Sequence, residues 1–180
     1  MTPYCQFVAD HPEQILHRIY HDTQYGFPLV EDAELFGRLL LEINQAGLSW
    51  TTILKKQEAF RWAYDAFDIP TIAAYGEAER ARLMGDVGII RNHLKINAAI
   101  ENAQRILALN GEFGSFKGWL DAHHPSDLDT WTKRFKKTFV FTGGEIVKEF
   151  LMSTGYLPGA HDEDCPVFSE IQISGPPWMA

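Results

Sequence analysis

The chain has 180 residues and a formal net charge of −8, with 46% hydrophobic and 13% aromatic residues. This size favours one domain with a packed core, and the composition excludes a disordered chain. The acidic balance argues against a general nucleic-acid binder, and without an apolar run of about 18 residues we expect no membrane span. The N-terminus lacks the pattern of a signal peptide, so we expect a cytoplasmic protein.

The N-terminal segment is rich in aromatic and histidine side chains and contains several turn-forming residues. Pro12 favours a short helix that reaches about Tyr20. The run from Tyr20 to Pro28 is predicted to be a turn, because Gly26 and Pro28 interrupt a helix.

A central helix is predicted from Leu35 to Ile43, where apolar residues recur at the three-and-four spacing of a helix with one buried face. Asp32 is the predicted N-cap. Glu42 lies within this apolar stripe, and a carboxylate among aliphatic side chains is costly unless it has a partner. Glu42 is therefore a candidate ligand-facing group, and the alternative is a partly exposed glutamate at the edge of the helix. Gly47 indicates a break after this helix.

The rest of the chain predicts more helices and no convincing β-hairpin, so the fold class is mainly α. Helical spacing indicates helices over residues 50–67, 91–109, 116–123, 127–135 and 146–152, with another helix ending near Met84. After Gly155 the proline and glycine content indicates an extended tail that either packs back or is disordered.

A glycine-containing turn, Gly85 to Gly88, joins two predicted helices. Such a pair resembles a helix-hairpin-helix, in which free backbone amides and the positive end of the second helix bind a DNA phosphate. A tight turn between any two helices also favours glycine, so the motif alone leaves both interpretations open.

Basic residues form local groups on this acidic chain. They are Lys133, Arg134, Lys136 and Lys137, with smaller pairs at Lys55 and Lys56 and at Arg91 and Lys95. They indicate either a local DNA-binding face or scattered solvated charges.

The two cysteines, Cys5 and Cys165, lie near opposite ends of the chain. His161 precedes Cys165 by four residues, and His21 lies in the N-terminal segment. Two cysteines and two histidines make a complete tetrahedral zinc set, which would be structural because it leaves no position for water. The alternative is an unrelated buried thiol at each end, and a disulfide is disfavoured in a reducing cytoplasm.

Several stretches of the chain together resemble one protein family, the constitutive bacterial 3-methyladenine DNA glycosylase I family. The similar stretches are Tyr20–Asp22 with Tyr25–Pro28, Gln45–Trp50, Leu54–Lys56, Gly88–Arg91 with Lys95–Ile96, Phe139–Val140 with Gly143, and His161 four residues before Cys165. They cover nearly the whole chain.

The resemblance implies a helix-hairpin-helix glycosylase-type fold with a structural zinc site that joins the termini. Residues 1–180 would form a single glycosylase domain, with 1–30 and 155–168 as the zinc-bound termini and 169–180 as a tail. The implied zinc ligands are Cys5, His21, His161 and Cys165. The implied base-binding residues are Glu42, Trp50, Tyr20, Tyr25 and Phe7, with Glu42 as the catalytic residue. The implied DNA contacts are Gly85, Gly88, Arg91 and Lys95.

The implied activity is that of a monofunctional hydrolase that removes 3-methyladenine from alkylated double-stranded DNA and releases the free base. The methylated base already carries positive charge. The enzyme therefore needs mainly to flip the nucleotide out of the duplex, stack the base and hold it while water attacks. Trp50 and Tyr20 would stack on the cationic base, and Glu42 would accept a hydrogen bond from its exocyclic amine. A monomer is expected, without a membrane partner.

The chain also departs from the family pattern. The departures are Cys5–Phe7 in place of Cys-Gly-Trp, Gln24–Tyr25 in place of Glu-Trp, Ile43–Asn44, and the segment Thr142–Glu149. They leave the substrate range open, including activity on 3-methylguanine. A glycosylase-like protein that binds DNA or a nucleobase without cleaving it is one alternative. A purely structural zinc domain is another, and it leaves Glu42 unexplained.

Overall fold

The computed structural model describes residues 3–180, and within that range the secondary structure is helical, with no β-strand. The α-helices are α1 (Pro3–Asp10), α2 (Ile15–Thr23), α3 (Asp32–Gln45), α4 (Trp50–Ala63), α5 (Ile69–Ala73), α6 (Glu77–Gly85), α7 (His93–Phe113), α8 (Phe116–His123), α9 (Leu128–Thr138), α10 (Gly144–Ser153) and α11 (Phe168–Ser174), with 3-10 turns η1 (Asp65–Phe67) and η2 (Pro177–Met179). The prediction of a mainly α fold is confirmed.

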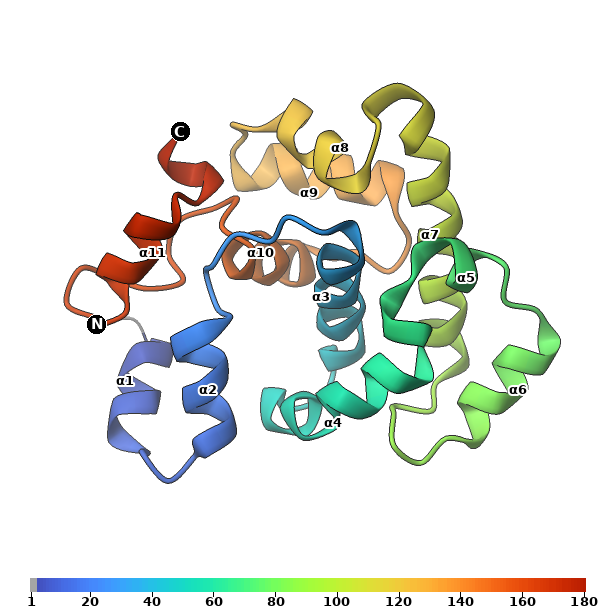
Figure 1. Ribbon diagram of the computed structural model, residues 1–180, viewed down its shortest axis with the longest axis horizontal. Coiled ribbons are helices and arrows are strands. Elements are labelled where there is room, and N and C mark those ends of the chain that lie inside the picture. Colours follow the sequence, from blue (N-terminus) through green and yellow to red (C-terminus); the bar gives the residue numbers. More distant parts are fainter. Residues whose placement is uncertain (1–2) are drawn as a thin grey trace.

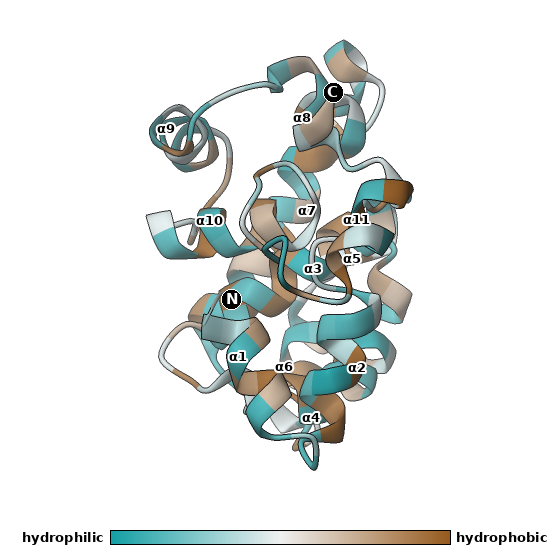
Figure 2. Cartoon of the chain, turned by 90° about the vertical axis from the view of Figure 1, so that its left-hand side faces the viewer, coloured by the Kyte–Doolittle hydropathy of each residue, from teal (hydrophilic) through white to brown (hydrophobic). Residues whose placement is uncertain are grey.

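Helix α3 lies at the centre of the molecule, and α4, α7, α8 and α10 pack around it (Figure 1). Every residue from Leu35 to Asn44 is buried, so this helix is enclosed on all sides and is not a surface helix with one buried face. Most of the other helices carry both hydrophobic and hydrophilic residues (Figure 2). Because α3 is enclosed, a polar group on it faces either another helix or an internal cavity.

The two ends of the chain meet on one side of the molecule, where α1, α2 and α11 lie opposite α5 to α7 (Figure 1). Cys5, Cys165, Val167 and Ile171 form a small apolar cluster there, separate from the main core. The C-terminal tail packs back, since the Trp178 N–H donates a hydrogen bond of 3.0 Å to the Gly155 carbonyl. The tail is also more regular than the extended segment that the sequence predicted.

The N-terminal region differs from its prediction. Helix α1 was not expected, and α2 extends to Thr23, so Tyr20 and His21 lie in the last turn of a helix and not in a turn. Both helices place their buried residues toward the same small clusters that receive the C-terminal segment. Tertiary contacts, and not local periodicity, therefore determine this region.

Asp32 has a different role from the predicted one. It is the first residue of α3, and Glu31 occupies the N-cap position. The Asp32 carboxylate instead accepts hydrogen bonds of 2.8 Å from the backbone N–H groups of Phe116 and Lys117. It therefore caps the start of α8 and joins two helices that are distant in sequence.

Gly37 allows the turn after α4 to pack closely against the central helix. A Cβ atom at Gly37 would lie 2.4 Å from the Phe67 ring, so only glycine permits this contact. Phe67 belongs to η1, where Asp65, Ala66 and Phe67 all have positive φ angles. This left-handed turn ends the helical run, so α4 stops at Ala63 and does not continue to residue 67. Within residues 3–180, no helix is both long and apolar enough to cross a bilayer.

Candidate active site

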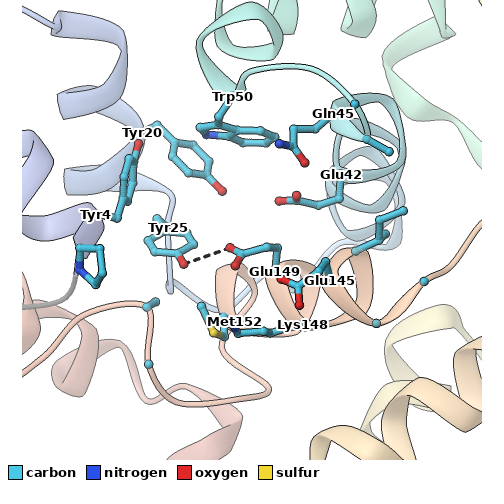
Figure 3. A pocket seen from close by; sticks show the side chains of 18 residues that line it. Tyr4, Tyr20, Tyr25, Glu42, Gln45, Trp50, Glu145, Lys148, Glu149 and Met152 are labelled. Atoms are coloured by element: carbon cyan, nitrogen blue, oxygen red, sulfur yellow. Dashed lines mark hydrogen bonds between the residues drawn. The ribbon is translucent and has the colours of Figure 1, made fainter.

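A cavity of about 970 Å³ opens between α2, α3, α4 and α10, and the start of α1 closes one side. Its lining combines aromatic rings, carboxylates and small residues that leave space for a planar ligand (Figure 3). The labelled side chains in Figure 3 are Tyr4, Tyr20, Tyr25, Glu42, Gln45, Trp50, Glu145, Lys148, Glu149 and Met152.

Glu42 projects from α3 into this cavity (Figure 3) and is only 4% exposed. None of the described residues donates a hydrogen bond to its carboxylate. Burial raises the pKa of Glu42 to about 8; Arg38 opposes this shift and Glu149 adds to it. A buried carboxylate without a hydrogen-bond donor is costly, so the geometry favours a ligand that supplies both a donor and positive charge.

Aromatic rings form the wall that faces Glu42. The Tyr20 and Trp50 rings meet edge to face with centroids 5.1 Å apart, and Tyr20 lies 5.6 Å from Tyr25. Tyr4 packs edge-on against Tyr25 at 5.4 Å. The buried Trp50 Nε1 has no hydrogen-bond partner within residues 3–180. The wall therefore offers ring faces on which a flat ligand can stack.

Arg38 holds this wall in place from behind. Its guanidinium lies 5.1 Å from the centroid of the Tyr20 ring and donates hydrogen bonds to the Tyr20 hydroxyl at 3.3 Å and to the Ser153 carbonyl at 3.2 Å. Arg38 is buried, and it precedes Glu42 by one helical turn. It thus fixes the Tyr20 ring, and its positive charge favours the ionised form of Glu42.

A second carboxylate, Glu149 on α10, lines the same cavity. The Tyr25 hydroxyl donates a hydrogen bond of 3.2 Å to Glu149 Oε2 (Figure 3). Burial raises the pKa of Glu149, and the hydrogen bond from Tyr25 partly offsets this effect. Glu42 and Glu149 thus place two acidic groups on adjoining walls of one cavity (Figure 3).

The structure brings together four of the five predicted base-binding residues: Glu42, Trp50, Tyr20 and Tyr25. The fifth, Phe7, does not line the cavity. It stacks on His11 with centroids 4.6 Å apart and packs edge-on against His17 at 5.1 Å. Phe7 follows Tyr4 by about one turn of α1, and the two rings stack with centroids 6.3 Å apart, so Tyr4 and not Phe7 reaches the cavity.

Of the four predicted DNA-contact residues, two make hydrogen bonds within the protein and two are exposed. Lys95 is buried, and its ammonium donates hydrogen bonds of 2.8 Å to the Asn44 carbonyl and 2.7 Å to the Ala46 carbonyl. The Gly88 N–H donates to Asp86 Oδ1 at 2.7 Å, so this amide is occupied inside the turn. Lys95 and the Gly88 amide are therefore not available to a phosphate as predicted.

Gly85 and Arg91 remain exposed at the connection between α6 and α7. Lys56 supports this connection from α4 by donating to the Val87 carbonyl at 2.9 Å and the Gly88 carbonyl at 3.2 Å. Because α4 begins at Trp50, the connection is tied to the helix that supplies one wall of the cavity.

Three residues of the site were missed from the sequence: Tyr4 and Glu149, which line the cavity, and Arg38, which lies behind its aromatic wall. Arg38 carried a usable signal, since a basic residue four positions before Glu42 in an apolar helix places opposite charges on one face. Tyr4 and Glu149 carried none, because their orientation depends on how α1 and α10 pack against distant parts of the chain.

Next to the cavity, the two ends of the chain bring together Cys5, His21, His161 and Cys165, all buried. Their potential ligand atoms lie within 4.8 Å of one another, so the group could hold a metal ion. The Cys5 Sγ atom lies 3.3 Å from His21 Nε2 and 3.6 Å from His161 Nδ1, and Cys165 Sγ lies 3.4 Å from His161 Nδ1.

Neighbouring groups orient both imidazoles toward the thiols. The outer nitrogen of His21, Nδ1, lies 2.7 Å from the Asp22 carboxylate, and the outer nitrogen of His161, Nε2, lies 2.8 Å from the Tyr25 carbonyl. Such partners bind the N–H of a metal-ligating imidazole and leave its other nitrogen free for the ion. Since Tyr25 also lines the cavity, the potential metal site and the cavity wall share a residue.

Comparisons with known proteins agree on one family. Residues 11–168 match the family described as methyladenine glycosylase. The DNA-3-methyladenine glycosylase 1 of Escherichia coli strain K12 is 36% identical over 170 residues, which cover 84% of this chain and 89% of the relative. The DNA-3-methyladenine glycosylase of Haemophilus influenzae is 34% identical over 185 residues, covering 92% of this chain and 98% of the relative.

Solved structures give the same result. The fold is similar to a structure on 3-methyladenine recognition by the 3-methyladenine DNA glycosylase I of Staphylococcus aureus, with a TM-score of 0.78 and 31% identity over 84% of this chain and 90% of the other. A 3-methyladenine DNA glycosylase I in complex with 3-methyladenine also aligns with a TM-score of 0.78 and 31% identity, covering 84% of this chain and 91% of the other.

Proposed function

This chain belongs to the methyladenine glycosylase family, and we propose that it hydrolyses the N-glycosidic bond of 3-methyladenine in alkylated DNA. The observation that carries the proposal is Glu42, a buried carboxylate without a hydrogen-bond donor among the described residues, in a cavity walled by Tyr20 and Trp50. Such a cavity suits a flat cation with an amino group.

In the proposed reaction the damaged nucleotide is flipped out of the duplex and its base enters the cavity. Tyr20 and Trp50 stack on the base, and Glu42 accepts a hydrogen bond from the exocyclic amine. The C1′–N9 bond then breaks with its electron pair passing to the base, which leaves as neutral 3-methyladenine. Water adds to C1′ and releases a proton. Because the methylated base is already cationic, no strong acid is required to protonate it.

Glu42 has two roles in this scheme. Its charge favours a cationic base over the neutral bases of undamaged DNA, since opposite charges in a water-poor cavity attract strongly. Its hydrogen bond to the amine fixes the orientation of the ring, so that the glycosidic bond faces solvent water. Tyr25 belongs to the same binding wall, whereas Phe7 packs elsewhere and has no direct contact with the base in this scheme.

We further propose that the Cys5, His21, His161 and Cys165 group binds a structural zinc ion. Zinc at about 2.3 Å from sulfur and about 2.0–2.1 Å from nitrogen places tetrahedral S and N ligands about 3.6 Å apart. The S–N separations of 3.3 to 3.7 Å in this group fit that geometry. Four protein ligands leave no open position, so the ion would join the chain ends and take no part in the reaction.

We also propose that the exposed connection between α6 and α7 contacts the DNA backbone through Arg91, in the manner of a helix-hairpin-helix. An acidic protein with few basic side chains gains only modest non-specific affinity from such contacts. Recognition of the damaged base would therefore supply much of the discrimination between alkylated and intact DNA.

The test is release of free 3-methyladenine from methylated duplex DNA, measured for the wild type beside Glu42→Gln. We expect release by the wild type and a loss of at least a hundredfold in the variant. A zinc-loaded, folded wild type that binds methylated DNA without releasing the base would instead establish a binding protein. Absence of both binding and release would leave the structural zinc domain.

A further inference from the structure

We propose that Glu149 is a second base-recognition residue, and that the carboxylates of Glu42 and Glu149 together select a purine that carries a formal positive charge. This inference rests on the proposed function and names a specificity determinant of the same cavity.

Glu149 and Glu42 face the same cavity from different helices. Glu149 lines the cavity from α10, while Glu42 lines it from α3, so a flat ligand between these walls meets both acids (Figure 3). The two carboxylates interact electrostatically, since Glu149 contributes to the raised pKa of Glu42. Two acids that repel each other are stabilised by a cation bound between them.

The Tyr25 hydroxyl orients the Glu149 carboxylate. Its Oε2 atom accepts the hydrogen bond of 3.2 Å from the Tyr25 hydroxyl, and Tyr25 is itself buried between Tyr4 and Tyr20. The hydrogen bond engages one carboxylate oxygen, and no described residue donates a side-chain or backbone hydrogen bond to the other. Glu149 is therefore a fixed group with a remaining acceptor, unlike a mobile surface glutamate.

Acidic side chains outnumber basic ones in the cavity lining. Glu42, Glu145 and Glu149 line the cavity together with one basic side chain, Lys148. Glu145 is exposed to solvent, so water screens its charge, whereas Glu42 is buried and Glu149 is half-buried. Once ionised, the two less exposed acids are therefore the charges that water screens least around the bound base.

Charge selection by two carboxylates also favours turnover. The nucleotide enters with a cationic base, and breakage of the C1′–N9 bond leaves that base neutral. The attraction that both acids exert on the substrate is thus lost when the product forms. Glu149 would strengthen binding of the substrate without strengthening retention of the product to the same degree.

Two small molecules distinguish binding of the cationic base from binding of the neutral product. The permanently charged 3,9-dimethyladeninium ion resembles the substrate base, because a methyl group at N9 takes the place of deoxyribose. Free 3-methyladenine near pH 8 is the neutral product. Both affinities are measured by calorimetric titration of the zinc-loaded protein. Glu149→Gln retains an oxygen that accepts the Tyr25 hydrogen bond, and Glu149→Asp retains the charge.

We expect Glu149→Gln to weaken binding of the cation about tenfold and binding of neutral 3-methyladenine less than twofold. Glu149→Asp should recover selectivity for the cation. Glu145→Gln, which removes an exposed charge from the same helix, should change the ratio of the two affinities less than twofold.

Equal losses for both ligands in Glu149→Gln would indicate a purely structural role and overturn the inference, as would no loss for either. Those outcomes leave the proposed function intact, because the wild type still binds both bases. A wild type that binds neither ligand would overturn the proposed base recognition itself, and the inference with it.

Discussion

The ammonium group of Lys95 donates a hydrogen bond of 2.7 Å to the carbonyl oxygen of Ala46. It also binds the Asn44 carbonyl, so Lys95 satisfies the last turn of α3 and the start of the loop that leads to Trp50. Burial lowers the pKa of Lys95, as expected for an amine with little water around it. The start of α7 thereby supports the loop between the two walls that carry Glu42 and Trp50.

Lys95→Met should destabilise the protein by about 1–3 kcal/mol, because it leaves two buried carbonyl groups without a donor. Excision of 3-methyladenine should fall with it, since the Ala46 loop lines the cavity. Urea unfolding and a base-release assay measure the two effects, with exposed Lys136→Met as the control. If Lys95→Met instead had normal stability and a weaker salt dependence of DNA binding, Lys95 would be a phosphate contact.

Glu42→Gln should stabilise the protein at high pH even as it removes activity. The pKa of Glu42 is raised from 4.5 to about 8, so the folded protein holds an extra proton between these pH values and loses stability as the pH rises through them. We expect the variant to exceed the wild type by up to about 4–5 kcal/mol at pH 8.5, and the difference to become small near pH 4.5. Urea unfolding at both pH values measures it, and an equal difference at both would contradict the assignment.

Binding of the permanently charged 3,9-dimethyladeninium ion should strengthen as the pH rises toward about 8 and then become constant. In the empty cavity Glu42 is protonated below this pH and must lose its proton to attract a cation; Arg38 favours the loss and Glu149 opposes it. The affinity should change by up to about tenfold per pH unit below the plateau. Calorimetry in buffers of different ionisation enthalpy should detect release of a proton on binding, and an affinity independent of pH would refute this coupling.

Removal of the metal should loosen the side of the molecule where the chain ends meet. Cys5→Ser and Cys165→Ser should each lose the zinc ion, measured by atomic emission, and lower the melting temperature. Hydrogen exchange should then increase in α1 and α2 more than in the main core around α3 and α7, because the terminal cluster is separate from that core. Uniform exchange across all helices would indicate that the ion supports the whole fold.

Arg91→Ala should weaken binding to undamaged duplex DNA and reduce the slope of log affinity against log salt concentration by about 0.9, as expected for loss of one phosphate contact. Affinity for the free base should not change, since Arg91 does not line the cavity. Lys136→Ala on α9 is the matched control. An unchanged slope for Arg91→Ala and a reduced slope for Lys136→Ala would place the DNA on the basic face of α9.

The sequence predicted the parts of the fold that local pattern determines. The spacing of apolar residues identified the central helix, and the predicted helix over residues 116–123 coincides with α8. Helix α1 was missed because its position depends on α2 and on the C-terminal segment. Asp32 was predicted to cap its own helix, but its carboxylate caps α8. A capping residue looks the same in sequence whether it serves its own helix or a distant one.

The cavity residues show the same limit. Glu42 and Trp50 could be selected because a lone carboxylate in an apolar helix and an indole after a glycine break are visible locally. Glu149 could be marked only as part of an unusual segment, since nothing in the sequence indicates which face of α10 meets α3. Lys95 was predicted to contact DNA for a related reason. Whether a lysine is buried depends on the path of the distant segment of the chain that supplies its hydrogen-bond acceptors.

The separation in sequence of the four residues that could hold a metal ion also imposes an order of assembly during translation. A ribosome delivers Cys5 and His21 early, but His161 and Cys165 only after the segments that form α3, α4 and α10 have been synthesised. Until then α1 and α2 lack the C-terminal residues against which they pack, and the cavity wall that carries Tyr4 and Tyr25 is incomplete. A partly made chain therefore lacks the part of the cavity lining that residues 143–160 supply.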